Sequence, residues 1–266
     1  MTKRLKTAEL FLSLGLVTTF AVACTPPTAE DATPDSTETE LGEVAVEGGE
    51  GGEGGEGGEG GEGGEGGEGI AYSEGEQANA DFQDRLSGPE LLDALQDGGH
   101  VIYFRHAQTE RDYADQADPN MSLDDCETQR KLSDVGINQS KEIGAAFEAN
   151  AIPVGNVITS EYCRAWQTAE LAFNRHQKDP RLNFLPFENY TEAQVEEMRE
   201  NVMPLLTAVP DVGQNTIIVG HDDIFEAATG IYPAPQGLAY VMTPDGTGGF
   251  ELVANVLPEE WASLAN

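Results

Sequence analysis

The stretch that decides the fold is His-Val-Ile-Tyr-Phe-Arg-His, residues 100–106 of a 266-residue chain. Its apolar residues follow one another without alternation, which is typical of a strand buried on both faces of a sheet. Residues 156–160 and 216–221 have the same continuous apolar character. Helical patterns separate these strands, and buried strands separated by helices predict an α/β fold. We expect a three-layer α/β/α sandwich with a mostly parallel central sheet.

The expected helices lie between the strands, on both faces of the sheet. Ser133 and Thr191 stand where two of them begin, and a hydroxyl at that position can accept a hydrogen bond from the first turn. Pro204 is expected to end or kink the helix that begins near Thr191. The expected helices cover residues 87–96, 133–150, 162–173 and 191–203, and a closing hairpin covers 238–243 and 250–256. The apolar positions of the helix after Ser133 are expected to be Val135, Ile137, Ile143 and Phe147.

The N-terminus has the organisation of an export signal. Three basic residues precede an apolar stretch, residues 10–23, which is too short to span a bilayer. The stretch leads into Ala-Val-Ala-Cys, residues 21–24, which resembles a bacterial lipobox, whose cysteine is lipidated and becomes the mature N-terminus. We therefore expect residues 1–24 to be a lipoprotein signal peptide, with the lipid on Cys24. The alternatives are an ordinary signal peptide cleaved just before the cysteine and an anchor that is never cleaved.

A low-complexity segment follows the signal. Residues 25–69 contain 14 acidic residues and no lysine or arginine, and the triplet Gly-Gly-Glu repeats from residue 48 to residue 69. Such a sequence buries no apolar surface and loses much backbone entropy on ordering. We expect residues 25–80 to be a disordered acidic tether that holds a single folded domain, residues 81–266, away from a membrane. A cation-binding or other specific acidic tract is the alternative.

The charge of the chain restricts its partners. The formal net charge is -34, and the part from residue 70 onward holds 33 acidic and 11 basic residues, which is a balance of -22. A surface this negative repels nucleic acid and anionic lipid headgroups. We expect no nucleic-acid partner, and contact with a membrane through the lipid anchor only. A site for an anionic substrate would have to gather its own local cations.

Cationic and imidazole side chains follow the ends of the buried strands. One strand ends in Arg105 and His106, and another ends in His221. The third ends at residues 159–160 and is followed by Arg164 at the start of a helix. Because the carboxyl ends of parallel strands meet at one edge of a sheet, these side chains are expected to lie together. Guanidinium groups suit phosphate oxygens, and a neutral imidazole can accept a phosphoryl group and release it to water.

Four motifs resemble those of the histidine phosphatase superfamily, which is phosphoglycerate-mutase-like. Arg-His-Ala-Gln-Thr, residues 105–109, is similar to its signature, although the usual tripeptide is Arg-His-Gly. Leu-Ser-Asp-Val-Gly-Ile-Asn-Gln, residues 132–139, resembles its helix-opening motif. The motif with the second arginine of the family resembles residues 159–169, Thr-Ser-Glu-Tyr-Cys-Arg-Ala-Trp-Gln-Thr-Ala. The motif with its second histidine resembles residues 219–221, Val-Gly-His. The resemblance covers about residues 98–256.

The resemblance implies a phosphatase mechanism. His106 would attack phosphorus and become phosphohistidine, and water would then hydrolyse this intermediate. Arg105, Arg164 and His221 would bind the phosphoryl oxygens and stabilise their charge in the transition state. No metal or other cofactor would be needed, because the cationic side chains supply the charge. The expected substrate is a phosphorylated small molecule or a phosphoprotein.

The general acid is open at this point. Asp222 follows His221 directly, as in the His-Asp pair of the acid-phosphatase branch of the superfamily. Glu188 lies in a region where the mutase-like branch often has its acidic residue. Asp112, Asp223 and the absence of a dedicated acid are further alternatives. The long acidic segment of residues 111–131 is expected to hang over the site and to influence the choice of substrate.

Two other functions compete with an exported phosphatase. The first is a metal-dependent hydrolase that uses His106, His221, Asp222 and Asp112 as ligands, although neighbouring arginines oppose metal binding. The second is a non-catalytic phosphate-binding domain on a tether. A mutase of phosphoglycerates is disfavoured, because export removes the chain from that metabolite pool. The expected location is the membrane on the extracytoplasmic side, as a periplasmic or cell-surface lipoprotein.

Two cysteines remain when Cys24 is set aside. Cys126 lies in the acidic segment, and Cys163 lies between a buried strand and Arg164. An even pair in an oxidising compartment predicts a disulfide, and both residues are expected at the same edge of the sheet. Two free thiols, one of them buried as a small apolar residue, are the alternative.

Overall fold

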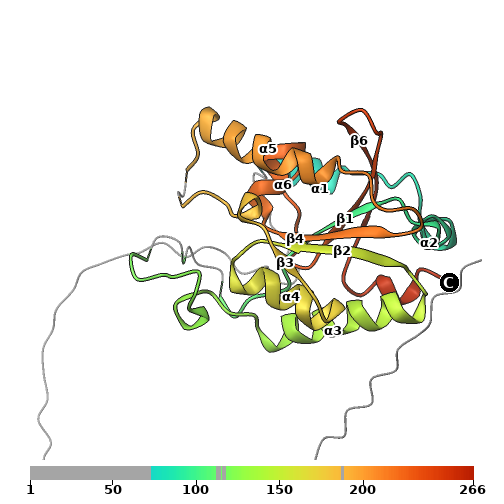
Figure 1. Cartoon of the computed structure of the whole chain (residues 1–266), viewed down its shortest axis with the longest axis horizontal. Helices are drawn as coiled ribbons and strands as arrows, with labels where there is room; N and C mark the ends of the chain where they lie inside the picture. Colours follow the sequence, from blue (N-terminus) through green and yellow to red (C-terminus); the bar gives the residue numbers. More distant parts are fainter. Residues whose placement is uncertain (1–72, 112–114, 116–117, 187–188) are drawn as a thin grey trace, which may run out of the picture. The chain divides into compact units, whose positions relative to one another are not determined.

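A computed structural model describes the folded part of this chain (Figure 1). The described residues are 73–266, without 112–114, 116–117 and 187–188. Four predicted features lie outside them, namely the signal segment 1–24, its Cys24, Asp112 and Glu188. The expected tether lies outside them as far as residue 72.

A six-stranded sheet forms the centre of the domain. Across the sheet the strand order is β3-β2-β4-β1-β5-β6. The first four strands in this order are parallel to one another, β5 is antiparallel to β1, and β6 is antiparallel to β5. This confirms the predicted α/β fold with a mostly parallel central sheet. The strands are β1 Val101–Arg105, β2 Val154–Thr159, β3 Gln177–Lys178, β4 Asn215–Gly220, β5 Ala239–Pro244 and β6 Phe250–Val256.

Helices cover both faces of the sheet. In Figure 1, α3 and α4 lie on one side of the strands, and α5 and α6 lie on the other. Among the described residues, no helix is both long and apolar enough to cross a membrane. The helices are α1 Glu74–Ala80, α2 Gly88–Asp97, α3 Asp134–Ala149, α4 Cys163–Phe173, α5 Glu192–Leu206 and α6 Asp222–Thr229.

Strand β1 separates two hydrophobic cores. Ile102 and Phe104 belong to the core beneath α3 and α4, whereas Val101 and Tyr103 belong to the core beneath α5 and α6. All four side chains are at most 1% exposed. Successive side chains of a strand point to opposite faces, so a strand covered on both faces needs apolar residues at every position. This is why the decisive stretch of sequence is continuously apolar.

The folded domain begins earlier than residue 81. Residues 74–80, expected to belong to the disordered tether, form α1 instead. Gly75 is buried, and a Cβ at that position would clash with a neighbouring side chain. Asn79 donates to the Ala234 carbonyl at 2.9 Å and accepts from the Tyr240 hydroxyl at 2.7 Å. The helix is held by the close packing of Gly75 and by the hydrogen bonds of Asn79. Its sequence therefore lacks the apolar periodicity from which a helix is predicted.

One of the two outcomes expected at Pro204 and the expected position of Val135 are wrong. Pro204 does not end its helix, because α5 continues to Leu206 with Pro204 inside it. Leu205 and Leu206 are buried, so continuing the helix gains apolar burial that offsets the hydrogen bond lost at the proline. Val135 is 54% exposed rather than part of the core face, because it lies in the first turn of α3, next to solvent.

Cys126 and Cys163 are joined by a disulfide. The bond links the short 3-10 turn Cys126–Thr128 to the first residue of α4 across a sequence separation of 37 residues. In the chain-entropy model, a loop of this length stabilises the folded state by about 4 kcal/mol.

Reduction of this bond is predicted to lower the melting temperature by about 10 °C, as expected for about 4 kcal/mol in a domain of this size. The measurement is a thermal melt with and without a phosphine reductant. The double variant Cys126→Ser/Cys163→Ser is the control, and it should melt low under both conditions. A reductant that frees both thiols, as shown by alkylation, without moving the melting temperature would contradict the prediction.

Candidate active site

His106 lies directly after β1 and is fully buried. Its Nδ1 lies 2.8 Å from the carbonyl oxygen of Ala107. A carbonyl oxygen can only accept, so Nδ1 carries the hydrogen and Nε2 presents its lone pair. Arg130 Nη2 lies 3.4 Å from this Nε2. The backbone thus fixes the tautomer that a nucleophilic imidazole requires.

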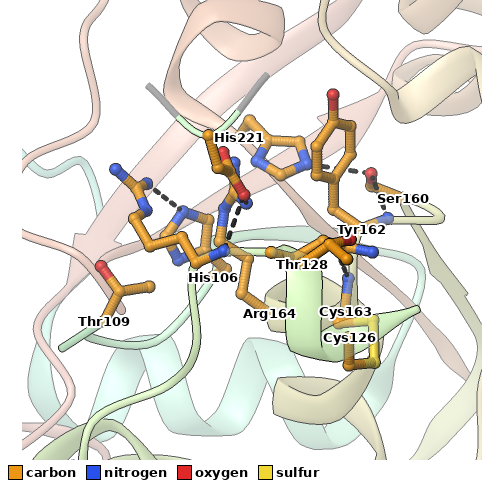
Figure 2. A network of polar contacts seen from close by, with 12 residues as sticks. His106, Thr109, Cys126, Thr128, Ser160, Tyr162, Cys163, Arg164 and His221 are labelled. Atoms are coloured by element: carbon orange, nitrogen blue, oxygen red, sulfur yellow. Dashed lines mark hydrogen bonds and ion pairs between the residues drawn. A yellow bond between two sulfur atoms is a disulfide. The ribbon is translucent and has the colours of Figure 1, made fainter. Parts of the chain in front are cut away.

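His221 follows β4 and is 1% exposed. Its Nε2 lies 2.9 Å from Ser160 Oγ, and its ring centroid lies 5.4 Å from that of His106. The rings of Tyr162 and Phe184 meet the His221 ring edge-on, at 5.1 and 4.6 Å between centroids. Figure 2 shows His106, His221 and Arg164 gathered in one network, with the disulfide beside it.

The Tyr103 hydroxyl supports the turn from β4 into α6. It donates to the carbonyl of His221 at 2.7 Å and accepts from the amide of the same residue at 2.9 Å. A Cβ on Gly220 would clash with this hydroxyl, so the preceding position has room only for glycine. Both backbone groups of His221 are therefore satisfied in the protein interior while its ring faces His106.

Three arginines surround the two histidines. Arg105 and Arg164 were expected here from the sequence, whereas Arg130 was not. The three residues are 4%, 2% and 8% exposed, respectively. The guanidinium of Arg164 also stacks over the Tyr162 ring, 4.8 Å from its centroid. A cluster of buried guanidinium groups is the feature that a phosphate site in an acidic protein requires.

Each of two arginines has a carboxylate partner. Arg105 Nη2 lies 2.5 Å from Asp222 Oδ2, and Arg164 Nη1 lies 2.8 Å from Asp115 Oδ2. Sequence reasoning missed Asp115 as well as Arg130. Arg130 had one weak signal, because it is a cation in an acidic segment just before the helix-opening motif. Asp115 had none, since it is one of several acidic residues in that segment.

Both histidines are neutral at ordinary pH. Burial lowers the pKa of His106 well below its usual value, and the charges of Arg164, Arg105 and Arg130 lower it further. Burial and the charge of Arg164 lower the pKa of His221 in the same way. An unprotonated His106 retains its lone pair, so the surroundings that would bind an anion also keep the nucleophile active.

The carboxyls after β4 have opposite environments. Burial acts to raise the pKa of Asp222, but the charge of Arg105 and a hydrogen bond from Tyr232 outweigh it and hold the pKa at about 2. Burial and the neighbouring charge of Asp222 raise the pKa of Asp223 to about 7. Asp222 is therefore ionised at neutral pH and does not suit the role of proton donor, whereas Asp223 does. Glu188 and Asp112 lie outside the described residues.

In the described part of the chain, no group of three or more His, Cys, Asp and Glu side chains could hold a metal ion. Asp222, expected as a ligand in the metal-dependent alternative, is instead paired with Arg105.

Residues 101–224 match the model of the histidine phosphatase superfamily, branch 1. The match spans β1 to the start of α6 and includes both histidines and all three arginines of the site. It supports the prediction that this chain is a phosphatase. No curated protein matches the sequence.

Three of the solved structures that resemble the fold are named phosphatases. The protein histidine phosphatase SixA complexed with tungstate is 15% identical, with a TM-score of 0.44. The putative phosphohistidine phosphatase SixA from Agrobacterium tumefaciens is 18% identical, with a TM-score of 0.39. The putative alpha-ribazole-5'-P phosphatase from Escherichia coli K-12 is 17% identical, with a TM-score of 0.45. Each alignment covers 60% of this chain and 98% of the other.

Replacing Asp223 by asparagine is predicted to raise the melting temperature more at pH 8 than at pH 5. The folded-state pKa of Asp223, about 7, lies above its value in the unfolded chain, so ionisation of this carboxyl costs stability as pH rises toward and through 7. Asparagine removes that cost.

Asp222→Asn is the matched control for this measurement. The pKa of Asp222, about 2, lies below its value in the unfolded chain, so its stabilising effect is complete at both pH values. The variant should melt lower than wild type at both pH values, but by less at pH 8, because removing the Asp222 charge also lowers the pKa of Asp223 and with it the cost of ionising that carboxyl. Equal gains for Asp223→Asn at the two pH values would show that its pKa is not raised.

Proposed function

We propose that this chain hydrolyses phosphomonoesters through a phosphohistidine intermediate on His106. The observation that carries the proposal is the hydrogen bond from His106 Nδ1 to the Ala107 carbonyl, which directs the Nε2 lone pair into a buried cluster of three arginines. A lone pair held in this way is suited to in-line attack on phosphorus. The substrate class is a phosphorylated small molecule or a phosphoprotein.

In the first step, Nε2 of His106 forms a bond to phosphorus while the bond to the ester oxygen breaks. Guanidinium groups of Arg105, Arg130 and Arg164 stabilise the charge on the phosphoryl oxygens. His221, held by Ser160 and Tyr103, lies beside them. In the second step, water attacks phosphorus while the bond to Nε2 breaks, and a proton of the water passes to the carboxylate that protonated the ester oxygen, so orthophosphate is released and both the imidazole and the acid are restored.

The departing ester oxygen needs a proton. Two carboxyls are candidates for its delivery, namely Glu188, which lies outside the described residues, and Asp223. Asp223 holds a proton for part of the time at neutral pH, because burial and Asp222 raise its pKa to about 7. Asp222 then has a different role: it holds Arg105 in place through their ion pair.

The prediction that tests this mechanism concerns His106. His106→Ala should lower kcat for an aryl phosphate by at least about 10⁴-fold, as expected when a nucleophile is removed. Rapid quench of the wild type should trap an acid-labile, base-stable phosphoenzyme. His176→Ala is the control, because His176 pairs with Glu170 on the surface, and it should turn over normally. Substantial activity in His106→Ala with no trapped phosphoenzyme would refute the proposal.

We also propose that the domain works outside the cytoplasm, anchored by a lipid on Cys24 and a tether that follows it. The sequence around residues 21–24 and the Gly-Gly-Glu repeat support this location. The Cys126–Cys163 disulfide supports it independently, because structural disulfides persist in oxidising compartments.

Cys24→Ser is predicted to prevent lipidation and to move the protein from the detergent phase to the aqueous phase on phase separation. The wild-type protein should have a lipidated cysteine as its first residue by mass spectrometry. An unmodified wild-type N-terminus at any other residue would rule out the anchor.

A further inference from the structure

The carboxylate of Asp115 lies inside the cationic site. Its Oδ2 accepts hydrogen bonds from Arg164 Nη1 and from the backbone amide of Arg130, both at 2.8 Å. Asp115 is 1% exposed. Nη1 of Arg164 is a donor that our proposed mechanism uses to bind phosphate, so Asp115 places an anionic oxygen on a donor that would otherwise be available to a phosphoryl oxygen.

The ion pair between Arg164 and Asp115 leaves one carboxylate oxygen without a hydrogen bond in the described part of the chain. Asp115 Oδ1 is buried and has no hydrogen-bond partner within the described residues. A buried ionic group normally requires hydrogen bonds on its remaining lone pairs to offset desolvation. An oxygen left in this state makes the bound carboxylate easier to replace by a better ligand, such as a tetrahedral anion with more acceptor oxygens.

The carboxylate and a substrate cannot both be present. His106, His221 and Arg164 are each at most 2% exposed, and Arg164 Nη1 is already paired with Asp115. Attack requires phosphorus to approach His106 Nε2 to about 3 Å. A phosphoryl dianion beside the Asp115 carboxylate would also suffer strong like-charge repulsion at low dielectric. A substrate must therefore displace Asp115.

Covalent and hydrogen-bonded links keep Asp115 near the site. Asp115 lies between Glu110 and Lys131 in the sequence, and these two residues are joined by a hydrogen bond from the amide of Glu110 to the carbonyl of Lys131 at 2.9 Å. The Cys126–Cys163 bond fastens the segment between them beside Arg164. An anion tethered in this way competes intramolecularly, at a high effective concentration.

We propose that Asp115 is an internal competitor for the phosphate pocket, which a phosphoryl substrate must displace from Arg164 and Arg130. Small free anions then bind weakly, and a substrate binds well only if its ester group contributes additional contacts. The inference rests on the proposed function for its kinetic consequences, although anion binding can be measured without turnover.

Asp115→Asn tests the proposal, because asparagine keeps the shape of the side chain and removes its charge. Calorimetry on the mature protein should show orthophosphate binding about tenfold or more tighter than in wild type, as expected from loss of a charge-assisted hydrogen bond that the ligand must replace. KM for an aryl phosphate should fall by a similar factor, with kcat within about twofold.

Asp124→Asn is the matched control, because Asp124 is an exposed residue of the same segment. It removes the same charge from the protein and should leave orthophosphate binding unchanged. Asp115→Ser is a second test variant and should reproduce the effect of Asp115→Asn. Circular dichroism and thermal melts establish that each variant is folded.

A measurement on the wild type keeps the test independent of folding in the variants. The amide of Arg130 loses its Asp115 acceptor if the carboxylate is displaced, so orthophosphate should accelerate hydrogen exchange at that amide. Orthophosphate that protects it, or a folded Asp115→Asn variant with unchanged or weaker orthophosphate binding, would overturn the proposal. Weaker binding would identify Asp115 as a positioning residue for Arg164. Tighter orthophosphate binding in a protein that hydrolyses no phosphomonoester would refute the proposed function and leave this inference standing.

Discussion

The parallel register between β1 and β4 is the constraint on which the site depends. It sets Arg105 opposite Gly220, so the residues that follow these two, His106 and His221, leave the sheet side by side. The amide of His106 continues the ladder by donating to the Gly220 carbonyl at 3.0 Å. A shift of one residue would turn every side chain of β1 to the opposite face, and the two cores that fix Phe104 and Tyr103 oppose such a shift.

The charges around the two histidines determine which ligand the site can bind and whether His106 is protonated. The chain has a formal net charge of -34, yet three arginines are buried around two neutral histidines. Burying a guanidinium is costly unless an anion accompanies it, and Asp222 and Asp115 accompany Arg105 and Arg164. The same positive field keeps His106 unprotonated. The acidic surface and the cationic interior are therefore separate features with opposite effects on an anionic ligand.

The strands and the two histidines were predictable because their signals are local. A strand covered on both faces has a continuous apolar sequence, and a polar residue at its end stands out. Asp115 and Arg130 were not predictable, because they lie in a segment without periodicity and acquire their roles from long-range contacts; the Arg164–Asp115 pair spans 49 residues. The same reason applies to α1, where Asn79 finds its acceptor 155 residues away. At Pro204 a local signal was present but misleading. The tendency of proline to end a helix is outweighed there by the apolar burial of the last turn of α5.

The Tyr103 hydroxyl beneath Gly220 has a consequence for how this sequence can diverge. The phenol serves both backbone groups of His221, and its oxygen occupies the space that a side chain at position 220 would need. A larger residue at 220 is tolerated only after the phenol has gone, and its loss leaves a buried amide and carbonyl in need of new partners. Positions 103 and 220 are therefore expected to covary among descendants of this chain, although neither side chain would touch a substrate.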